Sequence, residues 1–314
     1  QWQLTASAAA IHIVGKLLAS SGGFHGVSKN RAQNGACARG GWPVGACGTR
    51  LGATVVMVCR DRARGEAAQA DIKAQTANPS VDLLLADLAS LVAVRQLASD
   101  FKSKYDRLDV LVNNAGLTSG RRRESVDGLE LTLAVNHLAP FLLTNLLLER
   151  LETTGTPERK ARVVTVSSAA QVATPINFGD LQLRKSYNEM WAYGQSKLAN
   201  VLFTYELARR LERAGFNVTA NTLHPGLVRT NFAKNSFGVF SIPFKLTRPF
   251  HISPEKGAVT PLYLAASPEV EGVSGKYFVR QKPRKSAPFS YNEPAAVLLW
   301  EESARLTGLE GATI

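Results

Sequence analysis

The chain has 314 residues, 45% of them hydrophobic, which is enough for one large domain with a substantial core. Its formal net charge of +12 would suit a nucleic-acid partner, but the basic residues form no stripe with interleaved aromatic side chains. We therefore expect a solvated basic surface and no nucleic-acid partner. No apolar run reaches the roughly 18 residues that a transmembrane helix needs, so we expect no transmembrane segment and a cytoplasmic protein.

The three cysteines, Cys37, Cys47 and Cys59, have spacings that match no common metal motif. Their odd number also argues against a disulfide framework. We expect no metal site and no structural disulfide.

The amino-terminal part of the chain differs in composition from the rest. Residues 1–60 contain no Asp or Glu, although they hold all three cysteines and two of the four tryptophans. From Gly52 onward the pattern of apolar and polar residues becomes regular. We therefore divide the chain into an atypical segment, residues 1–50, and a single domain, residues 51–314.

Within that domain, short apolar runs alternate with polar-faced helical patterns. The runs predict buried strands, and the patterns between the first of them predict helices over residues 61–77 and from a Ser90 cap to residue 104. The predicted strands are residues 53–59, 81–86, 108–113, 163–166, 218–223 and 275–278. Alternating strands and helices indicate an α/β fold with a doubly wound parallel sheet.

One stretch combines residues suited to proton transfer. Ser167 and Ser168 follow a predicted strand, and Tyr193 and Lys197 stand four residues apart, which places them on one face of a helix. A free phenol has a pKa of about 10, and a neighbouring cation should lower it so that Tyr193 becomes usable as a general acid or base. Alone, the pair is equally consistent with a helix-surface contact. The residues that flank the pair distinguish a proton-transfer site from a surface contact.

The sequence around this pair resembles the short-chain dehydrogenase/reductase family, in particular its retinol dehydrogenase-like branch. The resemblance rests on residues 162–168, 193–210 and 218–226 and covers the chain from about Leu51 to Phe278. It implies a Rossmann-type fold and a catalytic tetrad of Asn136, Ser168, Tyr193 and Lys197, with Ser167 as the alternative serine. His137, beside Asn136, we interpret as a packed helix histidine.

The family pattern also implies a nicotinamide cofactor site along the strand ends. The implied contacts are Asp87, Leu88, Asn114, Ala115, Gly116, Tyr193, Lys197, Pro225, Gly226, Val228 and Thr230. Arg60 follows the second strand, where open α/β sheets place the group that reads the adenosine ribose. A guanidinium suits a 2′-phosphate, so NADP(H) is favoured, while Asp61 keeps NAD(H) possible.

The phosphate-binding turn of the family, T-G-x-x-x-G-x-G, is missing. It should begin near Asn34, where residues 37–43 read C-A-R-G-G-W-P, and a second glycine cluster at residues 21–26 could be a displaced turn. We hypothesise that much of residues 28–50 is out-of-frame sequence, which the coding nucleotides read in all three frames would test.

The aromatic-rich residues 232–250 correspond to the family's substrate-covering loop and imply a lipophilic substrate, although such a loop could equally pack on a partner subunit in a homo-oligomer. The leading hypothesis is an NAD(P)-dependent oxidoreductase that interconverts an alcohol and an aldehyde or ketone. The alternative is a catalytically impaired binding or scaffold protein, because the phosphate turn is missing. A polyanion-binding protein is supported by net charge alone.

Overall fold

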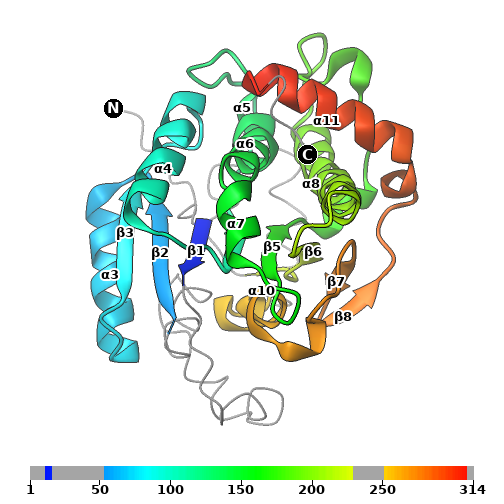
Figure 1. Cartoon of the computed structure of the whole chain (residues 1–314). Helices are drawn as coiled ribbons and strands as arrows, with labels where there is room; N and C mark the ends of the chain where they lie inside the picture. The colour runs from blue at the N-terminus through cyan, green and yellow to red at the C-terminus, as the bar shows by residue number, and fades with distance from the viewer. Residues whose placement is uncertain (1–10, 16–52, 229–250, 310–314) are drawn as a thin grey trace.

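The computed structural model describes residues 11–15, 53–228 and 251–309. Its strands form one sheet in the order β3-β2-β1-β4-β5-β6-β7-β8 (Figure 1). The strands are β1 Ile11–Gly15, β2 Thr54–Cys59, β3 Val81–Leu85, β4 Val110–Asn113, β5 Ala161–Val166, β6 Val218–His224, β7 Tyr277–Val279 and β8 Lys282–Arg284. β2 and β3 are parallel, as are β4 to β7, which confirms the predicted α/β fold.

The helices begin where the sequence offers capping side chains. Asp61 caps α3 (Arg62–Thr76), Ser90 caps α4 (Leu91–Lys104) and Asn188 caps α8 (Glu189–Arg213), each through a side-chain oxygen that accepts a backbone N–H. The remaining helices described are α5 Leu131–Leu133, the π-helical turn η2 Ala134–Leu138, α6 Ala139–Leu146, α7 Leu148–Thr154, α10 Pro254–Ala266 and α11 Glu293–Thr307. Short 3-10 turns include η3 Ala169–Val172 and η8 Pro288–Tyr291.

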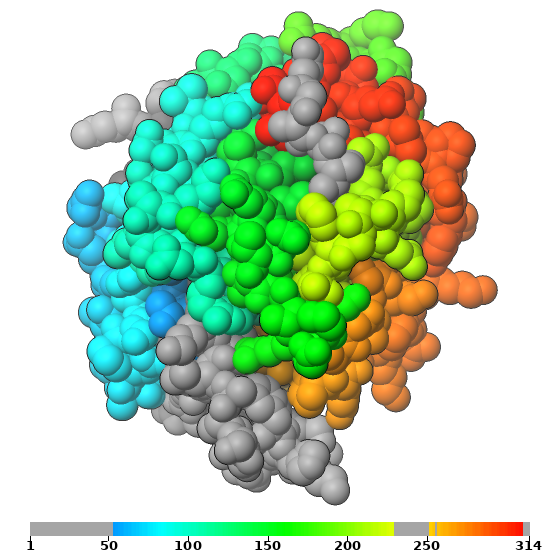
Figure 2. Space-filling view, viewed as in Figure 1, coloured from blue at the N-terminus to red at the C-terminus, as the bar shows by residue number. Residues whose placement is uncertain are grey.

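Alternate residues of the strands supply two separate cores, one on each face of the sheet. Val56 and Val58 of β2 belong to the core that packs against α4, α6, α7, α8 and α11, whereas Val55 and Met57 belong to the core shared with α3 and α10. The first group of helices lies in front of the sheet in Figure 1 and forms the middle of the surface seen in Figure 2. The sheet is therefore covered on both faces, as the continuous apolar strands predict.

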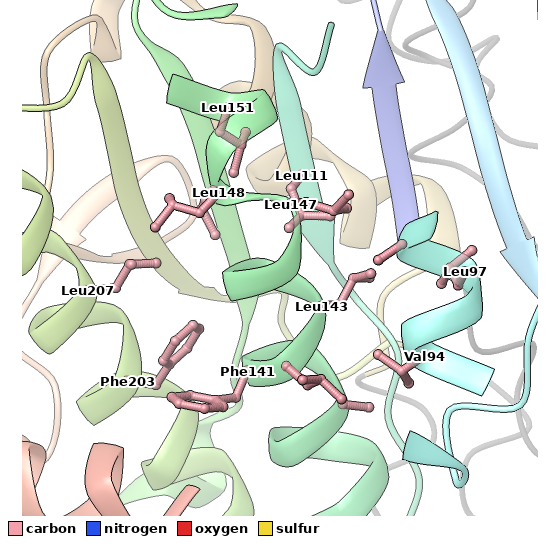
Figure 3. Close-up of a cluster of buried hydrophobic side chains, with 14 of the residues drawn as sticks. Val94, Leu97, Leu111, Phe141, Leu143, Leu147, Leu148, Leu151, Phe203 and Leu207 are labelled. Atoms are coloured by element: carbon pink, nitrogen blue, oxygen red, sulfur yellow. The ribbon is translucent and has the colours of Figure 1, made fainter. Parts of the chain in front are cut away.

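Aromatic rings pack in the centre of the larger core. Phe141 of α6 and Phe203 of α8 pack edge to face (Figure 3), with ring centroids 5.5 Å apart, and the ring of Trp300 of α11 lies 5.0 Å from that of Phe141. Leu143 of α6 and Leu147, which lies between α6 and α7, extend the same core toward α4. This packing fixes α8, which carries Tyr193 and Lys197, against the rest of the domain.

Two strands depart from the predicted parallel order. β8 adds an antiparallel edge strand to β7, and β1 occupies the central position between β2 and β4 but pairs antiparallel to both. Ile11 stands beside Val58 and Asn113, at the carboxyl ends of the neighbouring strands, and Gly15 stands beside Thr54 at the opposite edge. The apolar residues near Ile11 thus do form a central strand, but the chain runs through it in the direction opposite to a Rossmann first strand.

No single helix of the described residues is long and apolar enough to cross a membrane. The segments Leu131–Leu146 and Leu148–Thr154 satisfy the criterion only as a pair bent by 51°.

Candidate active site

The carboxyl ends of β2 to β6 bring the predicted site residues to one edge of the sheet. Parallel strands end on the same side, so the residues that follow each strand share that edge (Figure 1). The predicted residues described there are Arg60 after β2, Asp87 and Leu88 after β3, Asn114, Ala115 and Gly116 after β4, Ser168 after β5, and Pro225, Gly226 and Val228 after β6. Thr230 and residues 232–250 lie outside the described residues.

Helix α8 approaches this edge at its first turns. Asn188 accepts the backbone N–H of Trp191 at 3.0 Å and starts the helix just before Tyr193. Gly194 allows a close approach to η3, because a Cβ there would lie 3.0 Å from the Thr174 hydroxyl oxygen and 3.1 Å from the Ala170 carbonyl oxygen. The absence of a side chain at position 194 thus holds Tyr193 near the serine end of β5.

Tyr193 and Lys197 lie together as the four-residue spacing predicts, with the lysine Nζ 5.8 Å from the centroid of the tyrosine ring. The expected effect on the phenol is wrong in direction. Burial raises the pKa of Tyr193 to about 12, and a hydrogen bond from Ser168 offsets only part of this rise. Burial also lowers the pKa of Lys197 to about 8, because removal from water disfavours the ammonium. In this state the phenol keeps its proton at neutral pH.

The two serines have different surroundings. Ser167 is buried and its hydroxyl donates to the backbone carbonyl of Lys197 at 2.7 Å, which ties β5 to α8. The hydroxyl of Ser168 accepts the backbone N–H of Ala170 at 3.2 Å, and it is the side chain that lowers the pKa of the Tyr193 phenol against the effect of burial. The geometry therefore favours Ser168 over Ser167 as the serine that would face a substrate oxygen.

Asn136 lies in the π-helical turn η2, a local widening that often marks a functional site. Its amide nitrogen donates to the Leu117 carbonyl and to the Ser196 hydroxyl, both at 2.9 Å, while its oxygen accepts the Leu117 N–H at 2.7 Å. The side chain thus clamps the loop that follows β4. Gly116 in that loop is close to two tetrad members, since a Cβ there would lie 3.2 Å from Lys197 Nζ and 3.5 Å from Asn136 Oδ1.

Arg60, Asp61 and Asp87 follow β2 and β3, and they form the outer end of this edge of the sheet. The guanidinium of Arg60 lies 4.0 Å from an oxygen of Asp87, and both side chains are partly exposed. Asp61 accepts the backbone N–H of Arg64 at 2.9 Å as the cap of α3. The carboxylate of Asp61 is therefore already hydrogen-bonded to the first turn of α3. Arg60 stands where open α/β sheets place the side chain that contacts the adenosine ribose.

The Pro-Gly turn after β6 has a backbone conformation that requires glycine. Gly226 has φ +98°, and a Cβ there would lie 2.7 Å from the Ile252 side chain. The turn is fixed to the start of α10, because the N–H of Ile252 donates to the Leu227 carbonyl at 2.8 Å and Val228 forms a bridge with Ile252. Pro225 and Gly226 thus lie beside Ser168, on the neighbouring strand end.

These residues fit one half of a nicotinamide cofactor better than the other. The backbone at Gly116 lies close to the Lys197 ammonium, as the nicotinamide end of the cofactor would need. For the pyrophosphate, a Rossmann fold uses the turn at the carboxyl end of its first strand. Here that end of β1, Gly15, lies at the opposite edge, so the described residues supply no such turn.

Sequence reasoning missed two polar residues next to the tetrad, Asn200 and Ser303, and gave their neighbour His137 a packing role only. His137, Asn200 and Ser303 are at most 1% exposed, and the histidine ring contacts the other two. Asn200 lies one turn beyond Lys197 on α8, a spacing that points to a shared face; Ser303 lies on α11, far away in sequence. Among the described residues, no group of three or more His, Cys, Asp or Glu is arranged to hold a metal ion.

Comparison with known proteins agrees with this geometry. The family described as "short chain dehydrogenase" matches residues 48–238. Human polyprenol dehydrogenase is 41% identical over 266 residues, covering 84% of this chain and 81% of that protein. Human retinol dehydrogenase 14 is 43% identical over 280 residues, covering 83% of this chain and 80% of that protein.

Among solved structures, an uncharacterized protein from Mycobacterium paratuberculosis is 34% identical. It aligns with a TM-score of 0.66 and covers 84% of this chain and 89% of its own. The family match spans more than half of the 314 residues and begins close to Leu51, where the regular pattern starts. The chain therefore belongs to the short-chain dehydrogenase family of oxidoreductases and is retinol dehydrogenase-like within it.

Proposed function

We propose that this protein is an NADP(H)-preferring oxidoreductase that interconverts a lipophilic alcohol with its aldehyde or ketone. The observation that carries the proposal is the grouping of Ser168, Tyr193 and Lys197 at the carboxyl edge of the sheet, where Ser168 opposes the rise in the pKa of the Tyr193 phenol and the lysine Nζ lies 5.8 Å from the centroid of its ring. The family match does not favour the alternative of a non-catalytic scaffold.

The bound nicotinamide would supply or accept the hydride, and the chain's own residues handle the proton. Tyr193 is a neutral phenol over the physiological range, so it is ready to donate its proton to a carbonyl oxygen. Ser168 would hold that oxygen by a hydrogen bond, and Lys197, charged below a pKa of about 8, would stabilise the phenolate left behind. The protonation state thus supports carbonyl reduction as the direction that needs no prior deprotonation.

The preference for NADP(H) follows from the outer end of the site. Asp61 is the acid placed to hydrogen-bond a ribose 2′-hydroxyl, but its carboxylate caps α3. Arg60 offers a guanidinium at the end of β2 that suits a 2′-phosphate. Asp87, 4.0 Å from that guanidinium, would keep it oriented across the edge.

A lipophilic substrate is supported by the apolar side chains around the catalytic residues. Val172, which follows Ser168 in η3, and Met190 and Trp191, which precede Tyr193 on α8, are 59%, 41% and 37% exposed. These residues lie on η3 and α8, two segments that pack together at Gly194 and Ala170, and exposed apolar groups on adjoining segments suit a binding surface. The relatives named for polyprenol and retinol agree with an apolar alcohol. Localisation and oligomeric state stay predictions from sequence.

The test is a matched assay of carbonyl reduction. The purified protein is mixed with NADPH or NADH and with retinal, farnesal or glyceraldehyde, and loss of the reduced nicotinamide absorbance is followed. We expect turnover with NADPH and the two apolar aldehydes, little with glyceraldehyde, and none in Tyr193→Phe. Turnover that survives in Tyr193→Phe would contradict the proposed chemistry, and a preference for glyceraldehyde would contradict the substrate class.

A further inference from the structure

The π-helical turn η2 sends two consecutive side chains to different parts of the molecule. Asn136 contacts the loop after β4 and Ser196, whereas His137 points to α8 and α11. Both side chains are buried, with exposures of 0% and 1%. A buried imidazole lowers the stability of the folded state unless its ring nitrogens are hydrogen-bonded. We therefore identify the partners of both nitrogens of His137.

The two nitrogens of His137 join a chain of hydrogen bonds that ends at the catalytic lysine. Nε2 lies 2.9 Å from the Ser303 hydroxyl on α11, and Nδ1 lies 3.3 Å from Oδ1 of Asn200 on α8. The Asn200 amide nitrogen donates to the Val166 carbonyl at 3.3 Å, and Lys197 Nζ donates to the same carbonyl at 3.1 Å. Val166 ends β5, immediately before the two serines.

The direction of donation along these hydrogen bonds follows from the Val166 carbonyl, at which they end. Val166 can only accept, so the NH2 of Asn200 faces it and the amide oxygen faces His137. The imidazole then carries its proton on Nδ1, and the single proton of the Ser303 hydroxyl, which donates to the Leu299 carbonyl at 2.6 Å, is shared with the unprotonated Nε2 at 2.9 Å. A neutral imidazole therefore satisfies the network, in keeping with burial, which lowers the pKa of His137 to about 4.

We propose that His137 is a positioning residue that holds Asn200 against the Val166 carbonyl and thereby sets where the Lys197 ammonium lies relative to Tyr193. The proposal rests on the proposed proton-transfer role of Tyr193 and Lys197. Its geometric basis is the Val166 carbonyl, shared by the lysine and the asparagine. If Asn200 turns away, this carbonyl is left to the lysine alone, and Lys197 is drawn toward β5 and away from the phenol.

A packing role is the competing explanation, because the His137 ring also contacts aromatic side chains. Its centroid lies 6.3 Å from the ring of Phe141 and 6.2 Å from that of Phe203, in the core shown in Figure 3. Loss of packing would lower stability whichever hydrogen bond is kept. The packing role and the positioning role can therefore be distinguished with two variants that lose the same packing but retain different hydrogen-bond partners.

Two amides provide such a matched pair. The nitrogen of an asparagine side chain falls near the Nδ1 position of histidine, so His137→Asn keeps a donor for Asn200 and loses Ser303. The side chain of His137→Gln reaches the Nε2 position, so it keeps Ser303 and loses Asn200. Ser303→Ala is the control for the outer end of the chain, since it leaves His137 and Asn200 in place.

The experiment compares these variants in carbonyl reduction with NADPH and in thermal unfolding. We expect His137→Gln to lower kcat by about tenfold, the effect of one lost hydrogen bond, with little change in the KM of the aldehyde. His137→Asn and Ser303→Ala should stay within about threefold of the wild type, although His137→Asn melts as early as His137→Gln. Equal kcat in the two His137 variants, or kcat values that follow Tm, would overturn the proposal.

A second readout needs no turnover and so separates this proposal from the proposed function. In protein labelled with ¹³C at lysine Cε, the Lys197 signal, assigned by its loss in Lys197→Arg, is titrated with pH. We expect its midpoint to move in His137→Gln and to stay at the wild-type value in His137→Asn. If the midpoint moves while no aldehyde is reduced, the proposed function fails and the positioning role stands; an unmoved midpoint in His137→Gln removes the positioning role.

Discussion

Two regions of the same sheet contribute unequally to the cofactor edge. β4, β5 and β6 run parallel and deliver Gly116, Ser168 and Gly226 to that edge, where tightly packed backbone and the α8 side chains complete a catalytic group. β1, between β2 and β4, runs the other way, and its carboxyl end lies at the opposite edge. A strand position can be filled by any short apolar segment, but a phosphate-binding turn depends on chain direction. Within the described residues, the strand ends that carry the predicted catalytic residues are present, and a phosphate-binding turn is not.

The largest expected effect comes from removing the predicted proton donor. Tyr193→Phe should lower kcat by roughly 10² to 10⁴, the usual contribution of general acid–base catalysis, while NADPH affinity changes little. Steady-state kinetics and a cofactor titration on the same preparation check both parts. A variant with near-normal turnover would remove Tyr193 from the mechanism.

The second effect would come from adding a phosphate-binding turn. The sequence predicts that a T-G-x-x-x-G-x-G turn in place of residues 34–41, followed by a helix-forming sequence through residue 50, restores contacts to the pyrophosphate. These positions lie outside the described residues. Two regained hydrogen bonds to a charged group, each about 1.5 to 3 kcal/mol, should raise NADPH affinity by roughly a hundredfold or more. The control is the same graft with its glycines replaced by alanine; equal affinity of the two would refute the idea.

A smaller effect is expected at Arg60. Arg60→Asp removes the partner of a 2′-phosphate and adds a like charge, so the ratio of kcat/KM for NADPH over NADH should fall by about tenfold or more. Asp61→Asn is the matched control, because asparagine still caps α3 and only the charge is lost. If the ratio is unchanged in Arg60→Asp, another basic residue such as Arg62 or Arg64 reads the phosphate.

The smallest effect is a pH dependence set by Lys197. Its ammonium is charged below a pKa of about 8, whereas the Tyr193 phenol keeps its proton up to about 12. Carbonyl reduction should therefore be flat at neutral pH and decline above about pH 8 as the lysine loses its charge. Lys197→Met, which has no charge to lose, should show a low rate without this decline. A wild-type decline only near the ordinary lysine pKa would contradict the buried ammonium.

The comparison also separates what the sequence could predict from what it could not. Continuous apolar runs identified β2, β4 and β5, and the spacing of Tyr193 and Lys197 identified their shared helix face. The direction of β1 was not predictable, because a segment as short as Ile11–Gly15, which reads I-H-I-V-G, can pair in either direction. The exposed, charged β8 gives no strand pattern. The environment of His137 depends on a π-helical turn and on Ser303, 166 positions away, neither of which local spacing reports.

The pKa of Tyr193 shows the same limit. Spacing placed a cation beside the phenol, and from that alone a lowered pKa follows. The structure buries Lys197 and half-buries Tyr193, and desolvation raises the pKa of the phenol by more than Ser168 lowers it. Burial at a given position depends on packing from η3 and β5, which the sequence does not specify.

The most direct test is a titration of NADPH into the wild-type protein, followed by energy transfer from tryptophan to the nicotinamide, with Tyr193→Phe titrated alongside. Predicted catalytic residues at an edge whose described residues supply no phosphate-binding turn imply the same weak affinity in both proteins, with Kd well above about 10 μM, and measurable reduction only in the wild type. Low-micromolar binding would contradict the account, because it would mean that the chain forms a working phosphate loop despite the direction of β1.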